Sequence, residues 1–176
     1  IPYDQLVLAL GGTTNTAIIP GSETAMSFKT LGDAMYLRNH AIQQFEKAEV
    51  ERDPQEKRRQ LTFVFVGAGL VGIELVGEMS EFLPTVALAY RHVKPDELHY
   101  QLIEAGPRIA PEFEESISHY VARTLRGRGV IVRDNTKVEK IEPGRVHLPG
   151  GEIIEAQTIL LSAGVAEVPQ ILIEQL

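Results

Sequence analysis

The stretch FVFVGAGLVGIELVGE, residues 63–78, decides the fold that we predict for this chain. It opens with four apolar residues, which indicate a short buried strand because the run is too brief for a helix. Gly67, Gly69 and Gly72 follow with G-x-G-x-x-G spacing, and a helical pattern begins at once. Such glycines alone are weak evidence, but a strand before them and a helix after them form the context of a dinucleotide-binding motif.

Each glycine has its own role in such a motif. Gly67 allows the tight turn, Gly69 lets a pyrophosphate approach the backbone, and Gly72 lets the helix pack closely on the strand. The first turn of the helix then offers unpaired N–H groups and a positive dipole end to the phosphates. A simple tight turn is the alternative interpretation. The cofactor contacts predicted here are Gly67, Ala68, Gly69, Leu70, Val71 and Gly72.

The rest of the chain alternates between strand and helix patterns. Buried strands are predicted at 6–10, 63–66, 100–103, 130–132 and 158–161, and helices at about 31–50, 70–82 and 111–126. Alternating residues and tight turns predict an antiparallel meander at 137–141, 145–148 and 152–156. This order predicts an α/β, Rossmann-like three-layer domain, with a parallel sheet of about four strands flanked by helices, plus the three-stranded meander.

Several local signals place the ends and faces of these helices. Thr30 and Asp33 have the spacing of a capping box, Pro84 is expected to end or kink the second helix, and Pro111 suits the N1 position of the third. Residues 52–60 read as a charged loop. The predicted buried faces are Leu31, Ala34, Met35, Ala41, Ile42, Phe45 and Ala48 in the first helix, and Phe113, Ile117, Tyr120, Val121 and Leu125 in the third.

Glu104 stands at the end of the second strand of the motif. A carboxylate there can accept hydrogen bonds from the adenine ribose hydroxyls and would repel a 2′-phosphate. It lies further from the glycines than the usual spacing of about 20 residues, and an insertion at 91–98 would account for the excess. A solvated glutamate is the alternative. Arg108 complicates the choice of cofactor, because a nearby arginine accommodates NADP, but NADH is favoured.

Further contacts are expected around the same edge of the sheet. Glu74 is placed in the first helical turn, where the helix dipole stabilises a carboxylate, so it is either structural or directed at the nicotinamide end. Small residues at the end of the last parallel strand permit close approach of a ligand, although a strand-ending glycine explains them equally. The predicted set is completed by Ala105, Val138, Ala163, Gly164 and Val165.

Composition excludes several other functions. The formal charge of −7 argues against a nucleic-acid partner, because no basic stripe is available for phosphates. The chain has no cysteines, which excludes disulfides and thiolate metal sites within it, and its five histidines lack metal-ligand spacing. No apolar run approaches the roughly 18 residues of a transmembrane helix. We predict no metal site and no catalytic residue, because no acid–base or nucleophilic constellation is recognisable.

The motifs together resemble the NADH-binding half of the type II NADH:quinone oxidoreductases, within the FAD-dependent pyridine nucleotide-disulfide oxidoreductase superfamily. YDQLVLALGG at 3–12 resembles the segment that passes the flavin, and LRNH at 37–40 lies in the first helix of the NADH domain. GAGLVGIELVGE at 67–78 matches the glycine motif. LIEAGPRIAP at 102–111 resembles the second strand, and LLSAGV at 160–165 the closing strand.

The resemblance implies NAD(H) and FAD as cofactors and hydride transfer from NADH to FAD, followed by reduction of a quinone. It implies that Gly67, Gly69 and Gly72 hold the pyrophosphate, that Glu104 holds the ribose, and that Glu74 and Gly164 flank the nicotinamide. The chain lacks the FAD-binding glycine motif, the later G-D segment and the C-terminal membrane-binding helices of this family. Residues 1–22 are therefore predicted to be a remnant of the flavin-domain connection and 23–176 the NADH domain.

From this we expect a chain that binds NADH without turnover and does not hold FAD. Its partners would be the missing FAD-binding domain of the same polypeptide and, only through that parent protein, a quinone and the membrane surface. The parent is expected to be cytoplasmic and peripheral on the cytoplasmic face of the cell membrane, and a homodimer is left open. A non-redox nucleotide-sensing module and a methyltransferase-type α/β domain are the competing functions.

Overall fold

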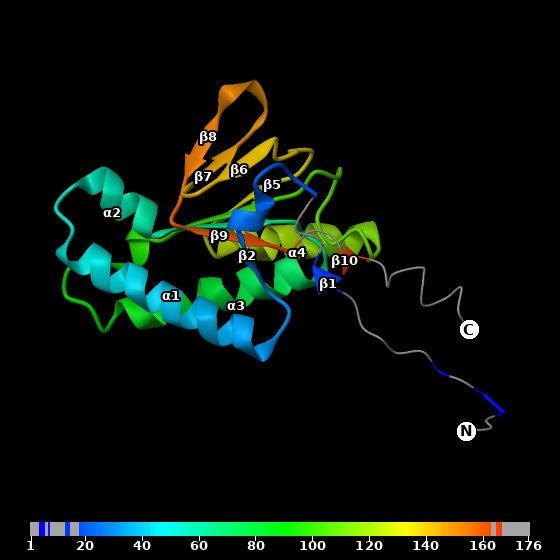
Figure 1. Ribbon diagram of the computed structural model, residues 1–176, viewed down its shortest axis with the longest axis horizontal. Coiled ribbons are helices and arrows are strands. Elements are labelled where there is room, and N and C mark those ends of the chain that lie inside the picture. Colours follow the sequence, from blue (N-terminus) through cyan, green and yellow to red (C-terminus); the bar gives the residue numbers. More distant parts are fainter. Residues whose placement is uncertain (1–3, 6, 8–12, 15–17, 163–164, 167–176) are drawn as a thin grey trace.

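The computed structural model describes residues 4–5, 7, 13–14, 18–162 and 165–166 (Figure 1). Its central sheet is parallel and has five strands in the order β2-β9-β3-β4-β5. Four of these strands were predicted, and the short β2 is an addition. The predicted strand at 6–10 lies outside the described residues, apart from Val7. The strands are β2 (Met26–Ser27), β3 (Thr62–Val66), β4 (His99–Ile103), β5 (Val130–Arg133) and β9 (Thr158–Leu161).

Two further layers cover the sheet (Figure 1). Helices α1 (Leu31–Val50), α3 (Leu70–Ala87) and α4 (Glu115–Gly127) pack on one face. The predicted meander, β6 (Lys140–Glu142), β7 (Arg145–His147) and β8 (Ile153–Glu155), covers the other. The connections contain the short 3-10 turns η1 (Ser22–Thr24), η2 (Pro95–Glu97) and η3 (Pro149–Gly151). Strand β1 (Thr13–Thr14) pairs with β10 (Val165–Ala166) in a separate antiparallel ladder. The predicted Rossmann-like three-layer architecture is confirmed.

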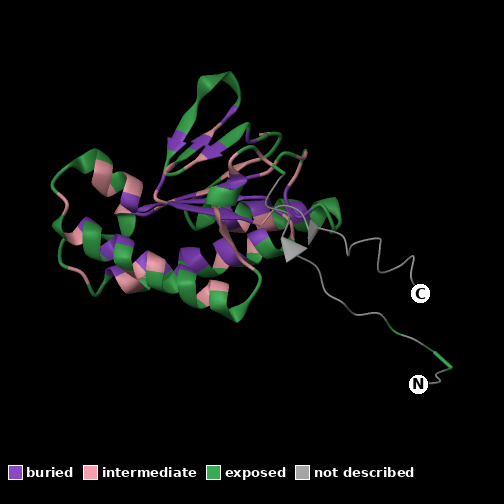
Figure 2. Ribbon diagram, viewed as in Figure 1, coloured by how far each residue is buried: buried purple, intermediate pink, exposed green. Residues whose placement is uncertain are grey.

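The central strand β3 divides the core into two clusters. All of its residues are buried (Figure 2). Phe63 and Phe65 pack among the helices, whereas Val64 and Val66 pack against the meander, because successive side chains of a strand point to opposite faces. A strand covered on both faces therefore reads as a continuous apolar run, which is why its position could be predicted from sequence.

Helix α1 begins at the predicted capping box. The Thr30 hydroxyl accepts a hydrogen bond from Asp33 N at 3.2 Å, and the Asp33 carboxylate accepts from Thr30 N at 2.7 Å. The predicted buried face is only partly correct. Ala41, Phe45 and Ala48 are buried, but Leu31 and Met35 are exposed, because the buried residues of α1 begin only at Leu37.

Two proline sites differ from the predictions, because Pro54 begins a helix and Pro84 does not end one. Residues 54–60 form a helix, α2 (Pro54–Gln60), where a loop was expected. Asp53 caps it by accepting from Gln55 N at 2.9 Å, and Pro54 occupies the first turn, where its missing N–H costs nothing. Helix α3 continues through Pro84 to Ala87. Leu83 and Ala87 are fully buried on either side of Pro84, and their packing offsets the one hydrogen bond that proline removes.

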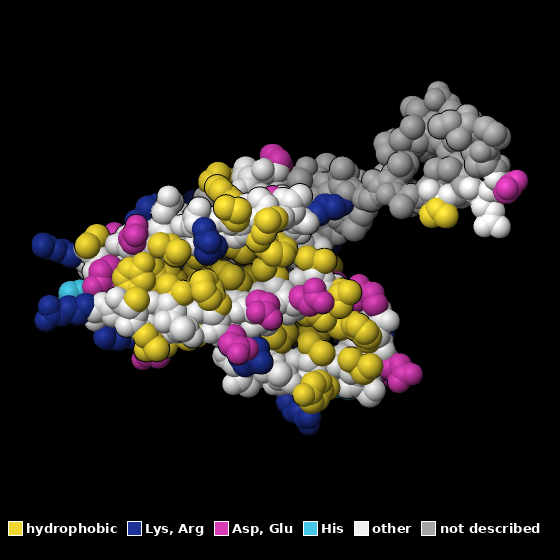
Figure 3. All heavy atoms as spheres, turned by 90° about the horizontal axis from the view of Figure 1, so that it is seen from below, with side chains coloured by type: hydrophobic (Ala, Val, Ile, Leu, Met, Phe, Trp, Pro, Cys, Tyr) yellow, Lys and Arg dark blue, Asp and Glu magenta, His cyan; other side chains and the backbone are white. Residues whose placement is uncertain are grey.

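Helix α4 starts later than predicted, and its buried face agrees with the prediction at Leu125 but not at Ile117 and Tyr120. It begins at Glu115, and Pro111 lies in the preceding loop. Its buried residues are Ser118, Ala122 and Leu125, whereas Ile117 and Tyr120 are exposed, as is Phe113 before the helix. Figure 3 views the molecule from the side of the helical layer, where exposed hydrophobic side chains lie among acidic ones.

Candidate functional site

The glycine-rich turn joins β3 to α3 at the carboxyl edge of the sheet. Gly67 has a φ of 100°, a conformation that strongly favours glycine, and its N–H donates to Ile103 O at 2.9 Å. A Cβ on Gly72 would lie 2.0 Å from Gly67 O, so the helix approaches the end of the strand as closely as glycine allows. The tight turn and the close packing predicted for these two glycines are both present.

Gly69 leaves the start of α3 open. It occupies the N-cap position with a φ of −70°, and no side chain among the described residues caps the helix there. A Cβ on Gly69 would meet only the Glu112 carboxylate, with Oε1 at 3.0 Å. Leu70 and Val71, which follow, are exposed. The first N–H groups of α3 therefore face a surface that a small anion can reach.

Glu104 follows the last residue of β4 and is tied to the glycine turn. Its Oε2 accepts from Ala68 N at 2.8 Å, and its Oε1 accepts from Gly106 N at 2.7 Å. The carboxylate is thus held beside the turn, at the strand end where the sequence places it, although its bonds to these two backbone N–H groups were not predicted. An ionised carboxylate has about four acceptor positions, so capacity remains for two hydroxyl donors of a ligand.

A pocket of about 130 Å³ opens next to this carboxylate. It brings together four of the predicted residues, Gly67, Glu104, Ala105 and Val138, although they come from three separate parts of the chain. Its walls are mainly apolar, and Glu104 is its only carboxylate among the described residues. Such a slot suits the flat ring of a nucleoside with its ribose at the carboxylate. Sequence reasoning missed six other lining residues: Ile18, Ile19, Val66, Ile103, Thr136 and Lys137.

Arg108 organises the loop that follows β4. Its guanidinium donates to Phe113 O at 2.8 Å, to Pro111 O at 3.0 Å and to Ser118 Oγ at 2.5 Å. Ala110, in the same loop, has a φ of 49° and donates its N–H to Ala68 O at 2.8 Å. Arg108 therefore clamps a loop that supports the glycine turn, and it does not line the pocket beside Glu104. This network also explains why Pro111 is not helical.

The remaining predicted residues that the structure describes, Glu74 and Val165, do not line the pocket beside Glu104. Glu74 is exposed on the second turn of α3, not on the first turn as predicted, because the helix begins at Leu70. Ala163 and Gly164 lie outside the described residues. Val165 is part of β10 and pairs with Thr14. Ser162, which the sequence did not single out, donates its hydroxyl to Gly67 O at 2.8 Å and joins the end of β9 to the turn.

Two negative observations apply to the described parts of the chain. In the ranges given above, no three side chains of the metal-binding types are grouped so that they could hold a metal ion. None of the helices in those ranges combines the length and the apolar character that crossing a bilayer would need.

The comparisons with known proteins agree on one family. The family described as Pyridine nucleotide-disulphide oxidoreductase matches residues 1–176. Type II NADH:quinone oxidoreductase NdhA of Mycobacterium tuberculosis is 34% identical over 177 residues, covering 96% of this chain and 37% of that protein. The external alternative NADH-ubiquinone oxidoreductase of Yarrowia lipolytica mitochondria is 30% identical over 143 residues, covering 81% of this chain and 25% of that protein.

A solved structure supports the fold. The structure of NDH2 from Plasmodium falciparum in complex with NADH superposes with a TM-score of 0.84 at 24% identity, and the match covers 96% of this chain and 36% of that one. The chain therefore spans about a third of the length of the relatives that it matches, and at this identity the structural likeness supports the fold alone.

Proposed function

The chain belongs to the pyridine nucleotide-disulphide oxidoreductase family, and from that premise we propose that it is the NADH-binding domain of an FAD-dependent NADH dehydrogenase that reduces a quinone. The strongest support is the position of the Glu104 carboxylate, held by Ala68 N at 2.8 Å at the mouth of an apolar pocket and beside an uncapped helix start. A nucleotide needs these three features together: a slot for the base, an acceptor for ribose hydroxyls and donors for phosphate.

The residues divide into roles along the bound nucleotide. The base would occupy the pocket against Ala105 and Val138, with the ribose hydroxyls on Glu104. The pyrophosphate would lie over Gly69 and accept from the N–H groups at the start of α3, with Gly67 and Gly72 shaping the turn. The nicotinamide would lie towards Glu74 and the end of β9, which assigns Ala163, Gly164 and Val165 to that part of the site.

NADH supplies a hydride when it is bound, and the redox partner would be an FAD held elsewhere in the parent enzyme. The chain's own residues bind and orient the nucleotide. We assign residues 1–22 to the connection with the FAD-binding domain and 23–176 to the NADH domain. Contact with a quinone and with the cytoplasmic face of the membrane would come only through that parent protein.

Gly69 provides the direct test of this function. A Cβ at this position meets only the end of the Glu112 side chain, so Gly69→Ala should fold normally while it obstructs a pyrophosphate. Gly77→Ala, on the same helix, is the matched control, because a Cβ there has no neighbour within 4 Å among the described residues outside its own helix backbone. Calorimetric titration should show NADH affinity at least about tenfold weaker for Gly69→Ala, which is about 1.4 kcal/mol, and unchanged for Gly77→Ala.

The same titration separates the competing functions. Tighter binding of ATP than of NADH would replace this proposal with a nucleotide-sensing module, and tighter binding of adenosylmethionine would replace it with a methyltransferase-type domain. A purified chain that is yellow and oxidises NADH rapidly would contradict the expectation that it neither holds FAD nor turns over.

A further inference from the structure

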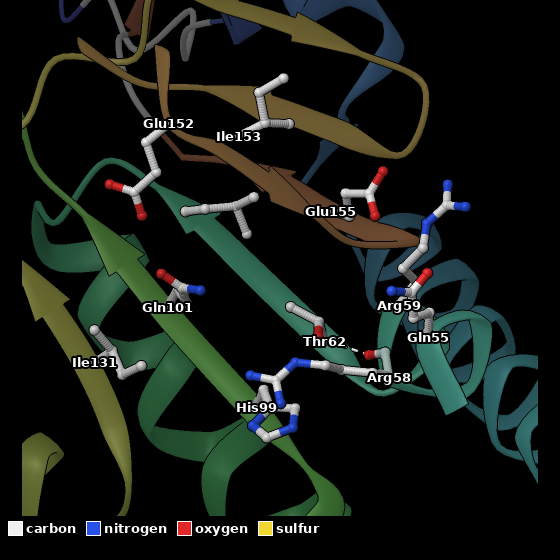
Figure 4. Close-up of a pocket in the computed structure, with 11 residues that line it drawn as sticks. Gln55, Arg58, Arg59, Thr62, His99, Gln101, Ile131, Glu152, Ile153 and Glu155 are labelled. Atoms are coloured by element: carbon white, nitrogen blue, oxygen red, sulfur yellow. Dashed lines mark hydrogen bonds between the residues drawn. The ribbon is translucent and has the colours of Figure 1, made fainter. Parts of the chain in front are cut away.

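A second, larger pocket lies at the opposite edge of the sheet, where the strands begin. Its volume is about 330 Å³, and it is a groove between α2, the amino ends of β3 and β4, and the strand β8 (Figure 4). Thr62 and His99 are the first residues of β3 and β4, whereas the glycine turn follows the last residue of β3. The groove is therefore separate from the proposed NADH pocket.

Among the described residues, the basic side chain that lines this groove without a counterion is Arg58. The neighbouring basic residues are neutralised: Lys57 pairs with Glu97 at 2.5 Å, and Arg59 pairs with Glu56 at 2.8 Å. No hydrogen bond or ion pair engages the Arg58 guanidinium within the described residues, and the side chain extends over Thr62 and His99 (Figure 4). The Thr62 hydroxyl donates to Arg58 O at 2.7 Å, which holds the backbone of Arg58 in place.

Two further donors face the same space. Gln101 and His99 lie two residues apart on β4 and so point to one face of the sheet. The Gln101 Oε1 accepts from Arg133 Nε at 2.9 Å, which turns the amide NH₂ into the groove (Figure 4). No hydrogen bond occupies that NH₂ or the His99 ring within the described part of the chain. Arg58, Gln101 and His99 thus line one groove, and no acceptor among the described residues binds the guanidinium, the amide NH₂ or the imidazole.

The carboxylates of the groove are already occupied. Glu152 forms two bonds to Arg133, at 2.8 and 3.1 Å, and Glu155 contacts Arg145 at 3.3 Å. Both therefore stay on the far wall with their own cations. Basic residues in the last turn of α2 would be favourable for the helix dipole in any case. The helix dipole explains why a basic residue stands at position 58. It does not explain why the Arg58 side chain extends over the groove, or why the Gln101 amide NH₂ faces the same groove.

We propose that this groove binds a small organic anion, whose carboxylate or phosphoryl group is held by Arg58, His99 and Gln101. Arginine and amide groups recognise such oxygens by charge-assisted hydrogen bonds. Ile154, which is 6% exposed, and the half-exposed Ile131 and Ile153 give the ligand's body an apolar surface. The volume of about 330 Å³ suits a ligand at the small end of the range for small-molecule sites.

The test is an NMR titration of the full chain, at fixed ionic strength, with inorganic phosphate in one arm and butyrate in the other. The reporters are the Gln101 side-chain amide and the His99 ring, and the tighter-binding arm identifies the group. We expect chemical shifts that saturate as the anion is added. Arg58→Ala should weaken the affinity about ten- to a hundredfold, as for loss of a charge-assisted hydrogen bond. Arg52→Ala, which removes an exposed arginine before α2, is the matched control and should change affinity less than about twofold.

A second variant keeps the fold and reverses the chemistry. Gln101→Glu retains an acceptor for Arg133 Nε but replaces the donating amide with a carboxylate, so binding in both arms should be lost while thermal stability is kept. NADH affinity should be the same in Arg58→Ala and in the unaltered chain. The proposal is overturned by shifts that do not saturate, or by Arg52→Ala weakening the affinity as much as Arg58→Ala does.

Discussion

The Glu104 carboxylate accepts a hydrogen bond from Ala68 N at 2.8 Å, so the tip of β4 and the glycine turn after β3 are held as one unit. A second bond, from Gly106 N at 2.7 Å, fixes the other oxygen. Glu104 consequently has a structural role in addition to its proposed role as an acceptor for the ribose hydroxyls of NADH. Experiments on this residue have to separate the two.

Glu104→Gln is expected to weaken NADH binding about ten- to a hundredfold, since hydrogen bonds to a charged group contribute roughly 1.5–3 kcal/mol. The preference for NADH over NADPH should shrink as well, because the charge that repels a 2′-phosphate is gone. Calorimetric titration with both nucleotides measures each effect. Glu139→Gln, at an exposed site, gives the same change in net charge and should leave both affinities unaltered.

The structural task of Glu104 is measured without nucleotide. Loss of a charged acceptor for two backbone N–H groups should lower the melting temperature of Glu104→Gln but not that of Glu139→Gln. If both NADH affinity and melting temperature are unchanged in Glu104→Gln, Glu104 is neither a ribose ligand nor a support of the turn.

Gly72→Ala should destabilise the fold by about 1–3 kcal/mol, as expected for overpacking. Its Cβ would lie 2.0 Å from Gly67 O and 2.7 Å from Ser162 Oγ, and the first of these is backbone that cannot move aside cheaply. Gly77→Ala, one and a half turns further along α3, should stabilise by about 0.4–1 kcal/mol, because it meets nothing and restricts the unfolded chain. Denaturant unfolding of both variants gives the comparison, and equal stabilities would show that α3 does not approach the strand so closely.

The glycine turn could be predicted from sequence because its determinants are local. Gly67, Gly69 and Gly72 stand within one short segment, and Glu104 is marked by the strand that it ends. The walls of the pocket are different. Ile18 and Lys137 come from connections more than a hundred residues apart in the chain, and nothing in their local pattern indicates a ligand. Only the packing of the meander on the sheet brings them to Glu104.

The buried faces of the helices could be predicted only in part, for a related reason. Periodicity in α4 predicted Ile117 and Tyr120 as readily as Leu125, but of these three only Leu125 is buried. Which edge of an apolar stripe is covered depends on how the helix is oriented on the sheet, and the local pattern does not show that orientation. The start of α4 also depends on side-chain contacts, since the loop before it has the carbonyls of Pro111 and Phe113 bound by Arg108.

Thr30→Ala should cost about 1 kcal/mol, the usual value for loss of an N-cap side chain. Its hydroxyl accepts from Asp33 N at 3.2 Å, so the variant leaves that N–H at the start of α1 without its cap. Thr124→Ala, which removes an exposed hydroxyl from the interior of α4, is the control and should be close to neutral. Denaturant unfolding at neutral pH measures both, and a Thr30→Ala chain as stable as the control would show that the cap is not formed in solution.

Asp33 adds a pH dependence to the same cap. Hydrogen bonds from Thr30 N and Lys29 N lower the pKa of Asp33. A depressed pKa in the folded state means that the contribution to stability is present above the unfolded value of about 3.9 and is lost as pH falls through the folded value. The stability difference between the unaltered chain and Asp33→Asn should therefore shrink below about pH 4. A difference that stays constant with pH would assign the effect to the side chain's shape and not to its charge.

His40 should make the fold weaker in mild acid. Burial lowers the pKa of His40, whose Nε2 lies 3.0 Å from Thr158 Oγ1 against the strand β9. Between that lowered pKa and the unfolded value of about 6.5, the unfolded chain binds more protons, so stability rises with pH across this window. The free energy of unfolding should accordingly fall between about pH 7.5 and 5.5, and His40→Gln should make the fall less steep. Burial also lowers the pKa of His99, so part of the slope should remain. His119→Gln, at an exposed position on α4, is the control, and an equal slope in the two variants would rule out His40 as the source.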